Sequence, residues 1–208
     1  MGNLTKDKPK PMLKVKNKPM LQHIVEMAVK EGFEKIFIST HYLAEQIHDY
    51  FGDGSTFGAD INYIFEEKPL GTGGSFARLP VEEGLCLVTN ADIISGVGYS
   101  KLVDFHRLHG GAATMAVKQH IIQHPFGVVK ADGVDLLEFE EKPIWKTNIN
   151  AGIYVLDMHL KKLIKKNEVI DMPNLIARAS KEYKDVKIFP LHESWIDLGD
   201  LEAYDNRC

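Results

Sequence analysis

Cysteine is scarce in this 208-residue chain, which contains only Cys86 and Cys208. Two thiols so far apart make a poor disulfide framework, so the composition argues against a disulfide-stapled extracellular fold. The chain also lacks a segment that joins a basic region to an apolar stretch and a small-residue cleavage site. We therefore expect a cytoplasmic protein, in which Cys86, within the apolar run LCLV, is a buried packing residue.

Long apolar runs and an excess of positive charge are missing too. No apolar run approaches the roughly 20 residues that a membrane-spanning helix needs, so we expect no membrane association. The net charge of -4 argues against a nucleic-acid binder, which needs a broad basic surface. Lysines gather instead near the start of the chain, at Lys6, Lys8, Lys10, Lys14, Lys16 and Lys18. We interpret this strip as a solvated basic arm in which one lysine contacts a phosphate.

Helix and strand patterns alternate along the first 120 residues. KPMLQHIVEMAVKEGF (18–33) carries apolar residues on one helical face, and KIFIST (35–40) follows as a buried strand. DINYIF (60–65), LCLVTN (85–90) and ATMAVK (113–118) are further strand patterns separated by helical segments. Such crossovers make a mainly parallel sheet, so we predict an α/β fold, a Rossmann-like three-layer α/β/α sandwich.

Shorter β-like runs follow residue 120, at 126–131, 135–141 and 149–156. We interpret this half as a substrate-facing lobe that continues the first sheet. No internal repeat or flexible linker divides the chain, so residues 1–208 are predicted to form a single domain.

A glycine-rich turn, EEKPLGTGGS (66–75), follows one of the predicted strands. Ligands of open α/β sheets bind beyond the carboxyl ends of the strands, and these glycines would let backbone amides approach a ligand closely. The spacing matches neither the dinucleotide-binding fingerprint nor the phosphate-binding P-loop. A purely structural turn is the alternative.

Two aspartates stand in positions that suit a metal ion. Asp92 lies in VTNADI (88–93), just beyond a buried strand, and Asp197 lies between apolar neighbours in WIDLGD (195–200). A buried carboxylate is costly unless it is paired or bound to a metal, so the two together predict an Mg²⁺ site. For Asp92 alone, a helix N-cap is the alternative.

An acid and a base are adjacent in FEEKP (139–143), at the end of a predicted strand. Glu141 could accept hydrogen bonds from sugar hydroxyls while Lys142 meets an anionic phosphate. An ordinary exposed turn is the alternative.

Taken in order, PKPML, PLGTGGS, NADI, FGVV, FEEKP, NAGIYV and WIDLGD resemble the motifs of the sugar-1-phosphate nucleotidyltransferases, also called nucleotide-sugar pyrophosphorylases. The resemblance runs over essentially the whole chain. It implies a Rossmann-like sandwich that joins a nucleoside triphosphate to a sugar 1-phosphate with Mg²⁺ as cofactor, giving a nucleotide sugar and pyrophosphate.

The resemblance also implies roles for individual residues. Lys10 would contact phosphates, and Asp92 and Asp197 would hold the metal. Sugar-phosphate contacts would fall on Gly127, Glu141, Lys142 and Asn150, and nucleotide contacts on Glu66, Pro69, Gly71 and Thr72. Ala91 stands where the family usually has glycine, which adds a methyl group beside the metal ligand.

The glycine-rich turn looks most like that of bacterial guanylyltransferases acting on aminosugar, heptose or mannose 1-phosphates. Guanine offers adjacent N–H donors that Glu66 or Glu67 could accept, whereas uracil offers one, so we expect GTP to be preferred. A sugar phosphate is already charged at neutral pH, so no general base is required. Catalysis would then rest on positioning and charge neutralisation.

The family places a strand and a glycine-rich loop ending in G-T-R before the region of LTKDKPKPML (4–13). We expect the natural protein to extend upstream, and this chain to bind nucleotide poorly without that loop. A related metal-dependent glycosyltransferase and a non-catalytic nucleotide-sugar-binding remnant are the alternatives. The sequence leaves open the sugar, a homo-oligomer and a fused regulatory domain upstream.

Overall fold

A four-stranded sheet forms the centre of the protein, whose computed structural model describes residues 7–198. Its strands lie in the order β11 (Val186–Leu191), β7 (Ala113–Gln123), β10 (Ile144–Asp157) and β5 (Leu85–Thr89). β11 is parallel to β7, whereas β10 is antiparallel to both of its neighbours. The predicted α/β fold is confirmed, with a sheet that is mixed because β10 runs against the others.

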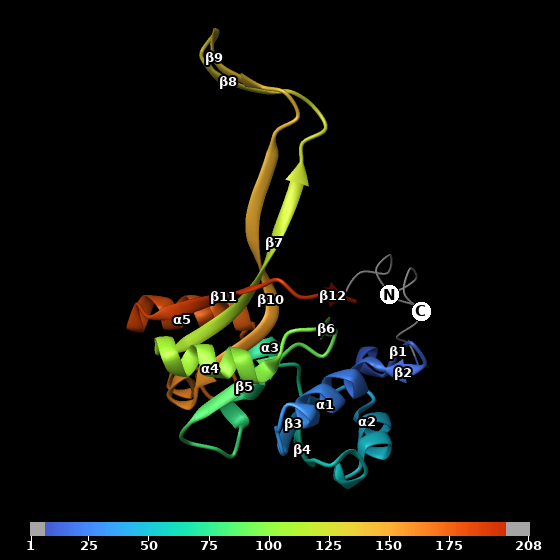
Figure 1. Cartoon of the computed structure of the whole chain (residues 1–208). Helices are drawn as coiled ribbons and strands as arrows, with labels where there is room; N and C mark the ends of the chain where they lie inside the picture. The colour runs from blue at the N-terminus through green and yellow to red at the C-terminus, as the bar shows by residue number, and fades with distance from the viewer. Residues whose placement is uncertain (1–6, 199–208) are drawn as a thin grey trace.

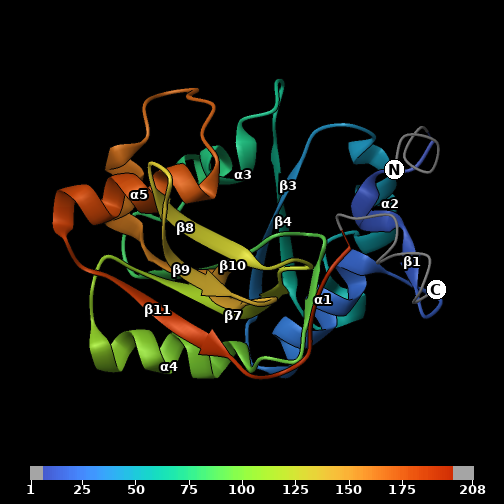
Figure 2. The ribbon, with the colours of Figure 1, turned by 90° about the horizontal axis from the view of Figure 1, so that it is seen from above.

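Helices cover both faces of this sheet, as a sandwich requires. Figure 2 shows α5 (Met172–Tyr183) on one face and α4 (Tyr99–His109) on the other. The core under α5 includes Tyr154, Leu156 and Leu175, and the core on the α4 side includes Leu102, Ile153 and Val155. Alternate residues of β10 therefore enter opposite cores, as the two-residue period of a strand dictates.

The helix predicted from residues 18–33 is α1 (Met20–Lys30), and its predicted apolar face is buried at Leu21, Ile24, Val25 and Ala28. The basic strip lies against this helix rather than in solvent, because Met12, Leu13 and Val15 are buried between the exposed lysines. Its first described elements are η1 (Lys10–Met12), β1 (Lys14–Val15) and β2 (Lys18–Pro19).

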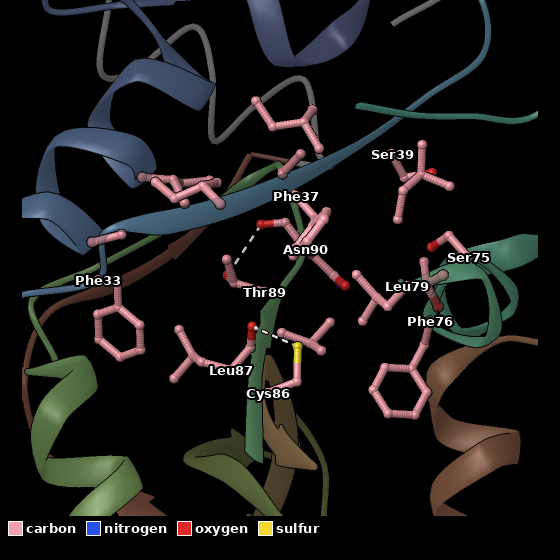
Figure 3. Close-up of a pocket in the computed structure, with 18 of the residues that line it drawn as sticks. Phe33, Phe37, Ser39, Ser75, Phe76, Leu79, Cys86, Leu87, Thr89 and Asn90 are labelled. Atoms are coloured by element: carbon pink, nitrogen blue, oxygen red, sulfur yellow. Dashed lines mark hydrogen bonds between the residues drawn. The ribbon is translucent and has the colours of Figure 1, made fainter. Parts of the chain in front are cut away.

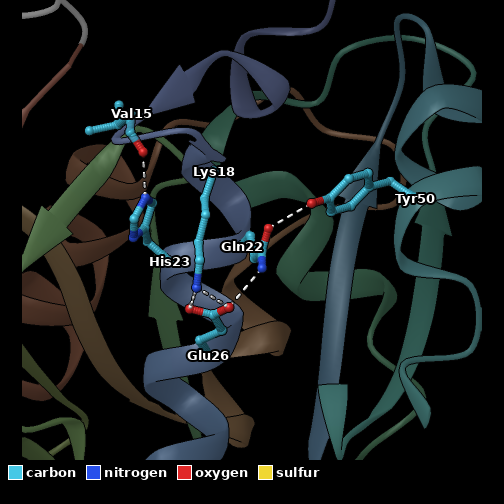
Figure 4. A network of polar contacts seen from close by, with 6 residues as sticks. All are labelled: Val15, Lys18, Gln22, His23, Glu26 and Tyr50. Atoms are coloured by element: carbon cyan, nitrogen blue, oxygen red, sulfur yellow. Dashed lines mark hydrogen bonds and ion pairs between the residues drawn. The ribbon is translucent and has the colours of Figure 1, made fainter. Parts of the chain in front are cut away.

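Polar contacts fix the strip to α1 (Figure 4). The ammonium of Lys18 lies 2.8 Å from the Glu26 carboxylate, and the ring of His23 is hydrogen-bonded to the carbonyl of Val15 at 2.8 Å. Gln22 donates to Glu26 at 2.7 Å and accepts from Tyr50 at 2.6 Å. The interpretation of the strip as a solvated arm is thus wrong for its backbone. The side chains of Lys8, Lys14, Lys16 and Lys18 are exposed, and Lys6 lies outside the described residues.

A second, separate sheet pairs β3 (Lys35–Thr40) in parallel with β4 (Asp60–Phe65). Its helix α2 (Ala44–Phe51) and the turn η2 (Ser55–Phe57) pack with α1 through Ile47, Phe51 and Phe57. Among residues 7–198, β3 has β4 as its single strand partner, and β5 has β10. Each of the two strands therefore has one edge without a neighbouring strand.

Beyond the central sheet, β7 and β10 continue as a long two-stranded arm (Figure 1). The inner half of β7 is buried, whereas its last five residues are exposed. The arm ends in the antiparallel hairpin of β8 (Val128–Asp132) and β9 (Asp135–Glu140). The predicted second lobe is therefore continuous with the first sheet through β7 and β10.

The remaining elements are short: α3 (Gly71–Gly74), η3 (Ser75–Arg78), β6 (Ile93–Ser95), η4 (Met158–Leu163) and β12 (Trp195–Asp197). β6 and β12 form an antiparallel pair. Across the described part of the chain, no helix is both long and apolar enough to span a membrane.

Candidate active site

An ion pair joins the N-terminal strip to the end of β5. Lys10 is the first residue of η1, where Pro9 and Pro11 restrict the backbone, and its ammonium contacts Oδ2 of Asp92. The two side chains remain 31% and 25% exposed. A lysine and a carboxylate thus meet at a partly open position beyond the carboxyl end of a strand, where α/β proteins bind ligands.

The backbone of Asp197 lies beside that of Asp92. Asp197 in β12 is paired with Ile93 of β6, and the amide of Leu198 donates to the carbonyl of Asp92 at 3.0 Å. The pairing of β6 with β12 therefore brings together two aspartates that are far apart in sequence.

These two residues fit the chemistry of Mg²⁺, which takes one or two carboxylates together with phosphate oxygens and water. Within residues 7–198 no group of three or more histidine, cysteine, aspartate or glutamate side chains is placed to hold a metal ion. The protein donors for a magnesium ion would accordingly be Asp92 and Asp197, with Lys10 as the neighbouring fixed positive charge.

Asn150 stands at an irregularity in β10 that lies next to the end of β5. The register between β10 and β7 shifts between Asn150 and Tyr154, and Gly152 has a φ of 72°. The side chain of Asn150 accepts from the amide of Gly152 at 3.0 Å and donates to the hydroxyl of Tyr154 at 2.5 Å. Burial raises the pKa of that tyrosine, so it remains a neutral hydrogen-bonding partner.

The bulge also contacts Asn90, two residues before Asp92. The amide of Asn90 donates to the carbonyl of Gly152 at 2.9 Å, and a Cβ atom on Gly152 would lie 2.9 Å from the Asn90 side-chain nitrogen. Asn150, Asn90 and Asp92 are consequently neighbours. Asn90 and Tyr154 were not among the site residues predicted from the sequence, although they lie within the motifs NADI and NAGIYV.

Glu66 has a structural partner for each of its carboxylate oxygens. It is 7% exposed, accepts from the hydroxyl of Ser39 at Oε1, and accepts from the amide of Leu70 at 2.7 Å at Oε2. It therefore joins the end of β3 to the glycine-rich turn. Of the two glutamates considered for base recognition, Glu67 is the exposed one.

The glycine-rich turn rests on the segment that precedes α5. The hydroxyl of Thr72 accepts from the amide of Met172 at 2.8 Å, and its own amide is 3.3 Å from Oδ1 of Asp171. Gly71 has a φ of 76°, and a Cβ atom there would lie 2.6 Å from the carbonyl oxygen of Ile170. Glycine at position 71 is thus required both by its backbone conformation and by the lack of room for a side chain. Pro69, two residues earlier, is exposed.

Gly127, Glu141 and Lys142 lie on the arm. Gly127 precedes β8, and a Cβ atom on it would approach Oε2 of Glu141 to 2.8 Å, so the two residues adjoin. Glu141 and Lys142 follow β9 and are exposed. Figure 1 shows this hairpin well apart from β6 and β12. The structure therefore brings Lys10, Asp92, Asp197 and Asn150 together and leaves the other three residues on the arm.

Cys86 is half-buried in β5, where it packs against the core under α5. Burial raises the pKa of its thiol to about 11, so the nucleophilic thiolate is scarce at neutral pH. This agrees with the expectation of a packing residue.

An α/β sandwich that presents a lysine and two aspartates beyond a strand end belongs to a class of folds that bind phosphorylated ligands at that edge. A profile of the family described as "Nucleotidyl transferase" matches residues 1–206. The chain belongs to this family.

Curated relatives agree with that assignment. The chain is 32% identical over 209 residues to a mannose-1-phosphate guanylyltransferase of Mycobacterium tuberculosis, with 97% of the chain and 58% of the relative covered. It is 31% identical over 207 residues to the D-glycero-alpha-D-manno-heptose 1-phosphate guanylyltransferase of Campylobacter jejuni, with 98% and 91% covered. The chain thus spans little more than half of the mycobacterial relative.

Solved structures share the fold. A putative glucose-1-phosphate thymidylyltransferase from Bacillus anthracis superposes with a TM-score of 0.79 at 20% identity, covering 100% of this chain and 88% of that one. HddC from Yersinia pseudotuberculosis gives a TM-score of 0.73 at 23% identity, with 97% and 89% covered.

Proposed function

We propose that the chain carries the active site of a sugar-1-phosphate guanylyltransferase, which transfers a nucleotidyl group from GTP to a sugar 1-phosphate and releases pyrophosphate. The observation that carries the proposal is the pairing of Lys10 with Asp92 beyond the end of β5, with Asp197 on the adjoining strand. Family membership and two guanylyltransferase relatives support it.

The charged residues of this site suit transfer at a phosphate. Lys10 would hold the phosphate chain and offset the negative charge that develops at the α-phosphate. Asp92 and Asp197 would hold Mg²⁺, which when bound neutralises phosphate charge and orients the oxygens for in-line displacement. The ammonium of Lys10 already contacts one carboxylate oxygen of Asp92. It therefore lies at the edge of the region where a phosphate would bind.

The sugar phosphate needs no activation by a protein base. Phosphate esters have a second pKa of about 6, so the attacking oxygen is charged at neutral pH. The attack forms a bond from that oxygen to the α-phosphorus of GTP and breaks the bond to the leaving pyrophosphate. The protein then has to position the two substrates, and we assign this role to Asn150 near the metal ligands and to Gly127, Glu141 and Lys142 on the arm.

For the base, we assign recognition to the loop that contains Pro69, Gly71 and Thr72, with Glu66 holding its shape and Glu67 as the exposed carboxylate. The guanylyl specificity rests on the two relatives, which are guanylyltransferases of mannose 1-phosphate and heptose 1-phosphate. A uridylyltransferase of Synechocystis, at 28% identity over 221 residues, shows that the base is not decided by family membership.

The test is a pyrophosphate-release panel of four nucleoside triphosphates against mannose, heptose and glucose 1-phosphates, run at high enzyme concentration so that slow single turnovers are seen. The expected result is release that requires both substrates and Mg²⁺ and is greatest with GTP. Comparable turnover with UTP or dTTP would overturn the guanylyl assignment. Release of a nucleoside diphosphate that depends on an acceptor would instead indicate a glycosyltransferase.

A further inference from the structure

The end of β5 is fastened to the bulge in β10. Figure 3 shows Asn90 just beyond Thr89, whose hydroxyl donates to the carbonyl of Asn90 at 3.3 Å. The amide of Asn90 donates in turn to the carbonyl of Gly152 in the bulge at 2.9 Å. Asp92 follows Asn90 by two residues. The backbone that carries this candidate metal ligand is therefore held by the bulge.

Trp195 makes the equivalent contact for the second candidate metal ligand. Its indole Nε1–H donates to the carbonyl of Ala151, the residue before Gly152, at 2.8 Å. Asp197 again follows by two residues. Ala151 is fully buried, so solvent cannot replace the indole as the donor. Two successive carbonyls of one bulge thus bind the segments that carry the two aspartates.

The alternation of β12 places Trp195 and Asp197 on the same face of the strand, because side chains two residues apart point the same way. Trp195 packs against the core on the α4 side. Ile196, which lies between them, packs against a different core cluster that includes Met20 of α1. The two opposed contacts fix the rotation of β12 about its own axis, and with it the side to which Asp197 points.

β12 depends on such contacts because it is short. It has three residues, and within residues 7–198 its single strand partner is β6. Two anchors hold the segment just before it. The ammonium of Lys118 donates to the carbonyl of Glu193 at 2.8 Å, and the carbonyl of Ser194 accepts from the amide of Gly96 at 2.8 Å. Of these anchors, Trp195 alone contacts the bulge.

We propose that Trp195 is a positioning residue, whose hydrogen bond to Ala151 fixes Asp197 relative to the bulge that carries Asn150. This inference rests on the proposed function, which assigns metal binding to Asp197 and sugar-phosphate contact to Asn150. Trp195 acts through the backbone and touches neither the metal nor a substrate. Its loss would displace the metal carboxylate and the Asn150 amide together, so one hydrogen bond couples the affinities for Mg²⁺ and for the sugar phosphate.

A role confined to packing is the alternative that the experiments must separate. Trp195 is partly buried, and a variant without its N–H loses some stability whether or not the residue positions the site. Positioning predicts in addition that β12 and the bulge loosen together while the rest of the fold is unchanged.

The first experiment is residue-resolved hydrogen exchange on the whole 208-residue chain with Trp195→Phe, which keeps an aromatic ring and removes the donor. The amide of Gly152 donates to the Asn150 side chain at 3.0 Å and reports on the bulge. The amide of Leu198 donates to the carbonyl of Asp92 at 3.0 Å and reports on β12. We expect both amides to exchange about tenfold faster or more, with the amides of β3 and β4 unchanged.

Tyr63→Phe is the matched control. It also removes a side-chain donor to a backbone carbonyl, that of Gly52 at 2.7 Å, and it lies in the second sheet. It should leave the amides of Gly152 and Leu198 unchanged.

Three exchange results would overturn the proposal. Unchanged exchange at both reporter amides in Trp195→Phe would show that the indole holds neither segment. Faster exchange at Leu198 alone would show that Trp195 holds only its own strand. An equal acceleration that extends to β3 and β4 would show a general loss of stability and no positioning.

The second experiment measures pyrophosphate release. Trp195→Phe should raise the KM for the sugar 1-phosphate and the Mg²⁺ concentration for half-maximal release about tenfold each, as loss of support behind metal ligands does. Tyr63→Phe should raise neither. Asn150→Ala and the double variant with Trp195→Phe should share one KM for the sugar 1-phosphate, because Trp195 acts on that substrate through Asn150. Two KM increases that multiply in the double variant would contradict the coupling.

The two experiments distinguish this proposal from the proposed function. If the unaltered chain released no pyrophosphate with any pair of substrates, the transferase assignment would fail. Hydrogen exchange needs neither substrate nor metal, so it would still decide whether Trp195 couples β12 to the bulge.

Discussion

The ammonium of Lys10 contacts the carboxylate of Asp92, a residue 82 positions further along the chain. This contact ties the proline-flanked start of the described chain to the end of β5. It brings the positive charge that a phosphate requires next to a carboxylate that a metal requires. Because the pair remains partly exposed, a phosphate can approach it from solvent.

Replacing Lys10 tests that arrangement. We expect Lys10→Ala to lower kcat of nucleotidyl transfer by about a hundredfold or more, the usual cost of losing a group that stabilises developing charge. Lys10→Arg, which keeps the charge, should recover part of it. Lys8→Ala, at an exposed neighbouring position, should leave kcat unchanged. Equal kcat for the wild type and Lys10→Ala would contradict the role.

Glu66 is expected to govern stability rather than base choice. Glu66→Ala leaves the amide of Leu70 without its acceptor in a buried place, which costs about 1–3 kcal/mol of unfolding free energy. Glu67→Ala should not alter stability, because Glu67 is exposed. Chemical denaturation measures the first effect. The ratio of GTP to UTP turnover then separates the roles, and a changed ratio in Glu67→Ala alone would assign base contact to Glu67.

Gly152 offers a test of the bulge beside the active site. Gly152→Ala combines a φ of 72° with a Cβ atom 2.9 Å from the side chain of Asn90, so we expect a loss of about 1–3 kcal/mol in stability together with reduced transfer. Gly110→Ala is the matched control, because its φ of 65° is similar and nothing lies within 4 Å. Thermal unfolding and turnover are measured on both, and equal losses would show that backbone strain alone explains the effect.

Stability at low pH is expected to depend on Glu168. Hydrogen bonds from Arg178 lower the pKa of this carboxyl from 4.5 to about 2. The folded-state pKa is depressed, so the stabilisation is fully present above pH 4.5 and is lost as the pH falls toward 2. Arg178→Gln should lower the unfolding midpoint at pH 6 and leave it close to that of the wild type at pH 2. A constant difference across this window would disprove the linkage.

Glu141 on the arm tests the assignment of sugar contacts there. Its side chain is exposed and adjoins Gly127, so Glu141→Ala should leave thermal stability unchanged. We expect the KM for the sugar 1-phosphate to rise about tenfold, the effect of roughly 1.4 kcal/mol of lost binding, with the KM for GTP unaffected. Glu138→Ala, on the same hairpin, is the control. An unchanged KM for the sugar 1-phosphate would show that Glu141 does not contribute to binding it.

Several elements could be predicted from the sequence because their signals are local. The apolar face of α1, the strands β3 and β4, and the position of Asp92 just after β5 follow from residue periodicity and composition. The direction of β10 could not be predicted, since a run of 14 residues with mixed character pairs with β5 and β7 only after the chain has turned back through the arm.

The sequence by itself determined the alternation of helix and strand, the order of the motifs and the family to which the chain belongs, because these depend on residue types and spacing. Tertiary structure decided that Lys10, Asp92, Asp197 and Asn150 adjoin, that both oxygens of Glu66 are engaged, and that Gly127, Glu141 and Lys142 stand on an arm. It also decided that β10 runs against both β5 and β7, since strands acquire their neighbours only when distant segments pack.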